Sequence, residues 1–344
     1  MPPRTFRIRE GTPLLDIVSF GRGGPRESGG RFTAEQIEQI RRTVQRTPEA
    51  LVKVLPRGSN DIKAARKHIE YIGRYGALEL EGDCGERLQG LVGKGLLEDW
   101  DLDIDADRPQ ATLHGASDRK PPKLVHKLMF SMPPGTPPDK VLAAVRTFAR
   151  EEFWGQHRYA FVLHTDEAHP HVHLVLKAVS ESGERLNIKK ATLRHWRAEF
   201  ARHLRQLGVA ANATERAVRG DARKAMRDGA YRASLRGDSS HVRSQALAAA
   251  ELLKAGSSTE GGKERLIETR QRVRDGWRGV SDKLMGQGNS LLANEVKRFA
   301  DAMAGARTDR EQIAVALGDT LRSRRMGWTT AEESRGTANL KRSR

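Results

Sequence analysis

The hydrophobic and polar positions of the chain follow two periods, which predict a series of strands and helices. Apolar residues at every second position, or short apolar runs that end at Pro or Gly, predict strands at 50–58, 77–82, 123–132, 158–165 and 171–180. Apolar residues at every third or fourth position predict helices at 33–45, 60–74, 139–154 and 191–208. The second helix is expected to begin after a cap at Ser59 or Asn60, and the last to end at Gly208.

The order of these elements predicts a fold class and three regions of the chain. Strands that alternate with helices, and two strands joined by the short turn DEAHP, indicate an α+β fold, with helices packed on the faces of an antiparallel sheet. We expect this fold at 49–220, after an N-terminal extension at 1–48. Residues 221–344 contain the linker GSSTEGG and helical patterns without a convincing strand, so a mostly α-helical C-terminal region is predicted.

The charge of the chain points to a polyanionic partner. The 344 residues include 61 Lys and Arg against 44 Asp and Glu, which gives a formal net charge of +17. Residues 221–344 hold 25 basic and 16 acidic residues, so they carry +9 and leave +8 for residues 1–220. A folded region that is itself basic favours a surface for DNA or RNA, although acidic membranes and acidic proteins also bind such surfaces.

The cysteine content and the apolar runs indicate in which cellular compartment the protein is expected. Cys84 is the only cysteine, which excludes an intrachain disulfide and a cysteine-based zinc finger and fits a reducing cytoplasm. No apolar run resembles a secretory signal, and none reaches the roughly 18 residues of a membrane span. We therefore expect a soluble, intracellular protein without membrane insertion.

Four of the eleven histidines lie in the block HTDEAHPHVHLVLKA, residues 164–178. Because residues two apart on a strand face the same side, His171 and His173 are expected to project together while Val172 faces the core. The intervening turn would fold His164 back beside that pair. Three neutral imidazoles that converge in this way suit a divalent ion such as Zn²⁺, Mn²⁺ or Co²⁺.

The turn itself adds two carboxylates and the fourth histidine. Asp166 and Glu167 belong to the type of group that orients a histidine ligand by accepting its second ring N–H. Other interpretations are solvated hairpin residues, or metal binding without catalysis. A further alternative is the histidine triad of nucleotide hydrolases and transferases, in which His169, His171 and His173 would act without a metal and the middle histidine would be the nucleophile.

Tyrosine is scarce, with Tyr71, Tyr75, Tyr159 and Tyr231 as its four occurrences. Tyr71 lies in KHIEYIGRYGALELEG, at the end of the second predicted helix. A tyrosine at a helix end usually packs against its neighbours. Beside a metal site in a basic protein, however, a phenol has a use as the nucleophile that attacks a phosphodiester.

The chain resembles conjugative and mobilisation relaxases, a family of HUH endonucleases. The shared segments occur in the same order and are HIEYIGRYGALELEG, KLVHKLMFSMPPGTPP, HTDEAHPHVHLVL and NATERAVRG. The resemblance covers residues 49–220 and is greatest to the P-type group, which includes the endonuclease that nicks T-DNA borders. Related HUH replication initiators and transposases place their tyrosine after the histidines, so the upstream position of Tyr71 favours a relaxase.

The resemblance implies roles for individual residues. Tyr71 would be the nucleophile, Asp166 a base or an orienting group, and His164, His171 and His173 the ligands of Mn²⁺, Mg²⁺ or Zn²⁺. Roles in supporting these ligands or contacting DNA are expected for Glu167, His169, Lys177, Arg216 and Arg219. Lys177 stands where the family often has Asn, and Tyr75 has no clear counterpart.

The function implied by the resemblance is nicking and rejoining of one DNA strand at a plasmid or integrative-element transfer origin. The intermediate would be a covalent 5′-phosphotyrosine, and the substrate would be single-stranded DNA of the nic region. Accessory relaxosome proteins and a type IV secretion coupling protein are candidate partners, in the bacterial cytoplasm. The alternatives are a histidine-triad nucleotide hydrolase and a non-enzymatic basic DNA-binding protein.

Overall fold

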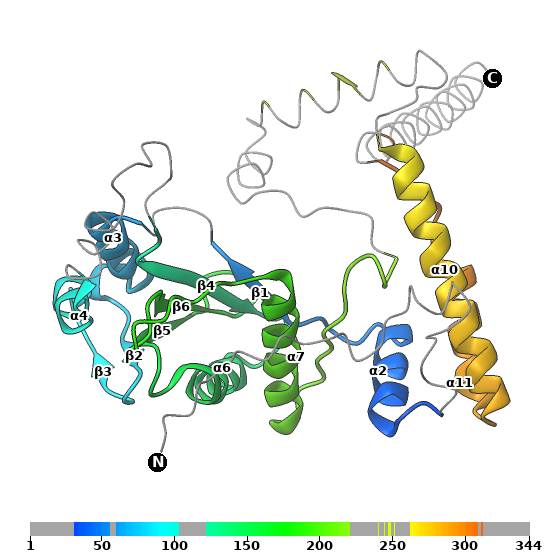
Figure 1. The fold of residues 1–344 in the computed structure, drawn as a ribbon, viewed down its shortest axis with the longest axis horizontal. Helices are drawn as coiled ribbons and strands as arrows, with labels where there is room; N and C mark the ends of the chain where they lie inside the picture. The colour runs from blue at the N-terminus through cyan, green and yellow to red at the C-terminus, as the bar shows by residue number, and fades with distance from the viewer. Residues whose placement is uncertain are drawn as a thin grey trace, which may run out of the picture. The chain divides into compact units, whose positions relative to one another are not determined.

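A six-stranded antiparallel sheet lies at the centre of the first of two compact units (Figure 1). The computed structural model describes residues 31–55, 60–102, 122–220 and 262–308, with a few single positions between 240 and 311. The unit with the sheet comprises Ala34–Thr214, and the second unit contains residues 31–33 and the described residues from Glu215 onward.

The strands lie in the order β1-β4-β6-β5-β2-β3, and each neighbouring pair is antiparallel. Their bounds are Leu51–Val54 (β1), Leu80–Gly82 (β2), Arg87–Leu88 (β3), Val125–Ser131 (β4), Tyr159–His164 (β5) and His171–Lys177 (β6). β5 and β6 form the predicted hairpin, in which His164 pairs with His171. The predicted α+β class with an antiparallel sheet is therefore confirmed.

Helices cover both sides of this sheet, with α3 and α4 on one side and α6 and α7 on the other (Figure 1). Their bounds are Ala34–Val44 (α2), Ile62–Ile72 (α3), Gly93–Asp99 (α4), Pro138–Phe153 (α6) and Lys190–Gln206 (α7), and the 3₁₀ helix η1 (Arg74–Gly76) follows α3. Side chains of a strand alternate between its faces. On β6, Val172 belongs to the core between the sheet and helices α6 and α7, as predicted. The two histidines beside it therefore face the side of α3 and α4.

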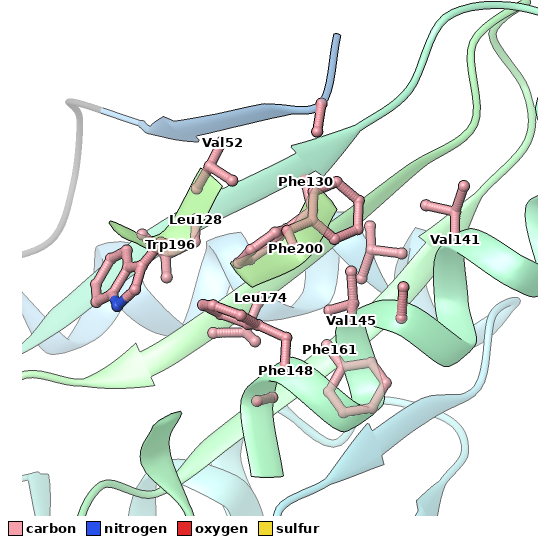
Figure 2. Packing of buried hydrophobic residues seen from close by; sticks show 14 of the residues in the cluster. Val52, Leu128, Phe130, Val141, Val145, Phe148, Phe161, Leu174, Trp196 and Phe200 are labelled. Atoms are coloured by element: carbon pink, nitrogen blue, oxygen red, sulfur yellow. The ribbon is translucent and has the colours of Figure 1, made fainter. Parts of the chain in front are cut away.

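Aromatic rings fill the core between the sheet and helices α6 and α7 (Figure 2). The ring of Phe130, from β4, lies 4.9 Å from that of Phe148 and 5.3 Å from that of Phe200, measured between centroids. Trp196 packs edge-on against Phe148, and all four side chains are fully buried. The apolar positions of α6 and α7, three or four residues apart, thus supply one face of this core.

We expect Phe130→Ala to lower the free energy of unfolding by about 3–5 kcal/mol, because it removes buried apolar surface and leaves a cavity beside Phe148 and Phe200. Urea unfolding followed by circular dichroism measures the change. Phe130→Leu keeps most of the volume and should lose less. A loss below about 1 kcal/mol for Phe130→Ala would contradict this description of the core.

Helix α3 begins at a different cap from the one expected. The carboxylate of Asp61 accepts hydrogen bonds from the backbone N–H groups of Lys63 and Ala64, each at 3.2 Å. Asp61 is therefore the N-cap, in place of Ser59 or Asn60. Its extended backbone and two acceptor oxygens suit this position, which must satisfy N–H groups of the first turn.

The segment after α3 also differs from the prediction of a strand at 77–82. The chain forms η1 at Arg74–Gly76, and β2 begins only at Leu80. Gly76 has a φ of +93°, and a Cβ there would lie 2.9 Å from the backbone of Gly90, so the turn requires glycine. Helix α4 and strand β3 were not predicted, because their segment is polar and too short to show a clear period.

The described C-terminal residues form two helices, as predicted for this region. These are α10 (Lys263–Gly286) and α11 (Ser290–Asp301), which pack through Trp277 and Phe299, with ring centroids 5.2 Å apart. The indole N–H of Trp277 donates to the carbonyl oxygen of Val218 at 2.8 Å. Within the described ranges, no helix combines the length and the apolar character that crossing a bilayer requires.

Candidate active site

Three histidine side chains meet where β5 ends and β6 begins. His164 is the last residue of β5 and pairs with His171, the first of β6, while His173 follows on the same face of the sheet. The ring centroids of His164 lie 5.1 Å from His171 and 4.8 Å from His173. One nitrogen of each ring lies within 4.8 Å of the other two, and the residues are only 2, 6 and 8% exposed.

Backbone carbonyl oxygens orient two of the three imidazoles. Nε2 of His164 lies 2.6 Å from the carbonyl oxygen of Ile72, and Nδ1 of His171 lies 3.2 Å from that of His169. A carbonyl can only accept, so these nitrogens carry the proton, and Nδ1 of His164 and Nε2 of His171 keep their lone pairs. The orienting acceptors are thus main-chain oxygens, where the sequence suggested carboxylates of the turn.

The third imidazole and the charge state of the cluster also suit metal binding. Nδ1 of His173 is buried and has no hydrogen-bond partner among the described residues. Burial, and then the neighbouring His164 and His171, lower the pKa of His173 to about 3, and burial also lowers the pKa of His164. Neutral imidazoles with converging lone pairs are the form that a divalent ion requires, and three ligands leave coordination positions open for a substrate.

The hydrogen bond from His164 also fixes the end of helix α3 against the cluster. Ile72 is the last residue of α3, and its carbonyl is one of those that a helix leaves without an internal partner. Ile69 and Ile72 are fully buried, whereas Tyr71 between them is 46% exposed. The predicted nucleophile therefore stands on the outer side of the helix end that His164 holds.

Arg74 joins this tyrosine to the histidines. Its guanidinium carbon lies 5.3 Å from the centroid of the Tyr71 ring, a cation–π distance, and its Nη2 lies 3.2 Å from Nδ1 of His164. The same group donates to the carboxylate of Asp166. Burial alone would lower the pKa of Arg74, but hydrogen bonds to Tyr71 and Asp166 raise it overall. A metal ion at Nδ1 of His164 would have to displace Nη2 from this lone pair.

The backbone around Arg74 is strained. Arg74 and Tyr75 have φ values of 50° and 54°, in the left-handed region that side chains disfavour. Such residues cost about 1–3 kcal/mol each and persist where the surrounding contacts hold them, often at functional sites. Here the three contacts of the Arg74 side chain supply that restraint.

The remaining predicted residues of the turn lie at the rim of the cluster. Asp166, Glu167 and His169 are exposed, and the His169 ring lies 5.5 Å from that of His171. Burial raises the pKa of Asp166, but the hydrogen bond and charge of Arg74 lower it overall. A carboxylate with a lowered pKa is a weaker proton acceptor, so the contact with Arg74 favours an orienting role for Asp166 over that of a base.

Lys177 is not brought to the histidines. It is the last residue of β6, about 20 Å along the strand from His171, and its Nζ lies 3.6 Å from a carboxylate oxygen of Glu181. Arg216 and Arg219 belong to the second compact unit. Contacts of these residues with DNA stay predictions.

Sequence reasoning missed three residues around the site, of which Arg74 is one. His68 lies one turn before Tyr71 on α3, with its ring 6.2 Å edge-on from that of His173. Lys127, on β4, is buried on the same face of the sheet as the histidines. The three-residue spacing of His68 from Tyr71 was an available signal, since both lie on α3 and positions three apart share a helix side. Lys127 becomes visible only through the pairing of β4 with β6.

The fold and the cluster together define the class of this domain. Adjacent antiparallel strands that present His-apolar-His and a third histidine are the arrangement of an HUH endonuclease. Residues 105–209 match the family described as relaxase, MobA/VirD2-like, nuclease domain, which supports a relaxase of the HUH type. The match begins at residue 105, upstream of β4, so it includes the three histidines but not Tyr71. The comparison with curated proteins gave no match.

Proposed function

We propose that this protein nicks and rejoins one DNA strand at a transfer origin, with Tyr71 as the nucleophile. The observation that carries the proposal is that one guanidinium, that of Arg74, contacts both Tyr71 and His164. This shared contact supports a single site made of the phenol and the histidine cluster. A divalent ion bound by the three histidines, Mn²⁺, Mg²⁺ or Zn²⁺, would supply charge neutralisation at the scissile phosphate.

In the proposed reaction the hydroxyl oxygen of Tyr71 attacks phosphorus, and the bond from phosphorus to the 3′ oxygen breaks. The phosphate stays on Tyr71 as a 5′-phosphotyrosine, the phenol loses its proton, and the departing 3′ oxygen gains one. Arg74 holds the ring of Tyr71 and stabilises negative charge beside it, and Asp166 holds Arg74. Because the phosphoester is conserved in the new bond, the 3′-hydroxyl can reverse the step and rejoin the strand.

The proposed substrate is single-stranded DNA of the nic region, bound through the basic surface of the protein. Residues proposed to support the ligands or contact this DNA are Glu167, His169, Lys177, Arg216 and Arg219. Accessory relaxosome proteins and a type IV secretion coupling protein are the proposed partners, in the bacterial cytoplasm.

The test is a covalent-adduct assay with single-stranded oligonucleotides that tile the DNA around the gene. With Mn²⁺ we expect one oligonucleotide to give a protein–DNA adduct that survives denaturing electrophoresis, and EDTA to prevent it. A histidine-triad enzyme would instead act on nucleotides in EDTA and depend on His171. A non-enzymatic DNA-binding protein would bind without an adduct, and either result would contradict the proposal.

We expect Arg74→Lys to slow adduct formation by about 10- to 100-fold, although the positive charge remains. The planar guanidinium of arginine contacts the Tyr71 ring, His164 and the Asp166 carboxylate at once. A lysine ammonium lacks this planar shape and cannot keep all three contacts. Initial rates at saturating oligonucleotide measure the loss. Arg66→Lys is the matched control, because Arg66 lies on the same helix and pairs with Glu70 at the surface. Equal rates for Arg74→Lys and wild type would exclude the proposed role.

A further inference from the structure

A buried lysine on the histidine face of the sheet has no part in the reaction described so far. Lys127 lies on β4 directly opposite Val175 of β6, and two residues before Met129, which pairs with His173. Residues opposite one another in an antiparallel pair project to the same face, so Lys127 shares the face of His171 and His173. It is only 4% exposed.

The ammonium of Lys127 has no counter-charge in the described part of the chain. Neither a hydrogen bond nor an ion pair joins it to any residue of the described ranges, and burial lowers its pKa to about 8. Burial is the one cause of this shift, and no carboxylate of the described residues raises the pKa of Lys127. Lysine is rarely buried unless it is paired, because an uncompensated charge in the interior is costly.

The neighbours of Lys127 connect it to the histidine cluster. His68 of α3 lies edge-on to His173, and its pKa is lowered to about 3, first by burial and then by the charge of Lys127. Lys127, His68 and His173 therefore form a row of nitrogen groups without an intervening carboxylate. Because both imidazoles are neutral, Lys127 is the cation of this group, and the anion that the proposed reaction brings to this face is the phosphate backbone of DNA.

We propose that Lys127 binds a backbone phosphate of the substrate strand next to the scissile one, and so positions the strand over the histidines. This inference rests on the proposed function. Lys127 is a positioning residue, because it acts through the register of the strand and not on the reacting atoms. The bound phosphate would provide the counter-charge that the described residues do not supply, so it would offset the cost of burying Lys127.

Lys127→Met tests the inference with opposite effects on stability and binding. Methionine removes the buried charge and keeps the apolar stem, so we expect the melting temperature to rise by about 3–6 °C. Affinity for single-stranded oligonucleotides should fall by about 10- to 100-fold, as when a hydrogen bond to a charged group is lost. The salt dependence of binding to oligo(dT) should weaken by about 0.7 in the log–log slope, the contribution of one phosphate contact.

A methylphosphonate scan identifies the contacted phosphate. Neutral linkages are placed one at a time around the nic position, and binding is measured with Tyr71→Phe, which is expected not to cleave. At one position the neutral linkage should weaken binding by the protein that keeps Lys127. The same linkage should not weaken binding by the protein that also carries Lys127→Met, because the contact is already lost. Lys140→Met is the charge-matched control, since Lys140 lies on α6 at the other side of the sheet.

The outcomes separate this inference from the proposed function. An unchanged salt slope, or a scan in which no linkage depends on Lys127, would overturn the inference even when the wild type forms the adduct. A fall in melting temperature together with an unchanged affinity would assign Lys127 a structural role and overturn it equally. Absence of the adduct with wild type would contradict the proposed function, while the oligo(dT) slope still decides on Lys127. Should Lys127→Met not fold, Lys127→Gln replaces it in each measurement.

Discussion

Tyr71→Phe is expected to abolish the covalent protein–DNA adduct, with a loss of roughly 1,000-fold or more, as for other nucleophiles that lack a substitute. The substitution removes only the hydroxyl oxygen that would attack phosphorus. The ring stays in place against Arg74, and the buried Ile69 and Ile72 still anchor this end of α3. Melting temperature and oligonucleotide affinity should therefore remain close to those of the wild type. Denaturing electrophoresis of the protein with a nic-region oligonucleotide and Mn²⁺ measures the adduct.

Tyr75→Phe is the matched control for this prediction. Tyr75 is four residues further along the chain and 70% exposed, so it is a second phenol close to the site in sequence. It lies beyond the helix end that His164 holds, and we expect its variant to form the adduct at the wild-type rate. An adduct that persists in Tyr71→Phe and disappears in Tyr75→Phe would exchange the roles of the two residues. Persistence in both would exclude a tyrosine of this segment.

The histidine cluster could be predicted from the sequence because its geometry is local. Alternation along one strand fixes the common face of His171 and His173, and the six residues of the connecting turn return the chain from His164 to the start of that strand. Both rules act within fifteen residues of chain. The same alternation correctly assigned Val172 to the core.

The surroundings of the cluster could not be predicted, because they depend on how distant segments pack. The carbonyl of Ile72 reaches His164 across 92 residues, and Lys127 joins the site only through the register between β4 and β6. Sequence patterns indicate that a strand exists, but they do not show which residue of one strand pairs with which residue of the next. The turn at Arg74 could not be predicted for the same reason. Its left-handed backbone is stabilised by contacts with Tyr71 and Asp166 that form only in the folded chain.

One helix end links the proposed nucleophile to the candidate metal site, and this link has a consequence for mutagenesis. His164 would serve as a ligand through Nδ1 and as a clamp on α3 through Nε2. Loss of His164 would therefore disturb the position of Tyr71 as well as metal binding, and its effect could not be assigned to either cause. Nδ1 of His173 makes no hydrogen bond to α3, and the ring meets that helix only edge-on at His68. It is the better residue for testing the metal alone.

His173→Ala is accordingly expected to lower the affinity for Mn²⁺ by about 100-fold or more, above the 10- to 100-fold typical of losing an outer partner of a ligand. The adduct should disappear at limiting Mn²⁺ and return in part at high concentration, because His164 and His171 remain. EDTA should suppress the wild-type adduct to the same level. Isothermal titration calorimetry measures metal affinity independently of cleavage, and the adduct assay reports its consequence.

His195→Gln is the matched control, since His195 lies on α7 at the other side of the sheet and contacts Glu152 at 2.8 Å, a bond that a glutamine amide can replace. It should leave both metal affinity and the adduct unchanged. The affinity of His173→Ala for single-stranded DNA should also stay near that of the wild type, since most binding free energy comes from distributed phosphate contacts. Equal Mn²⁺ affinity in His173→Ala and wild type would show that the three imidazoles do not form the metal site. Loss of metal affinity with an intact adduct would separate the ion from the reaction and leave Arg74 as the main source of positive charge beside Tyr71.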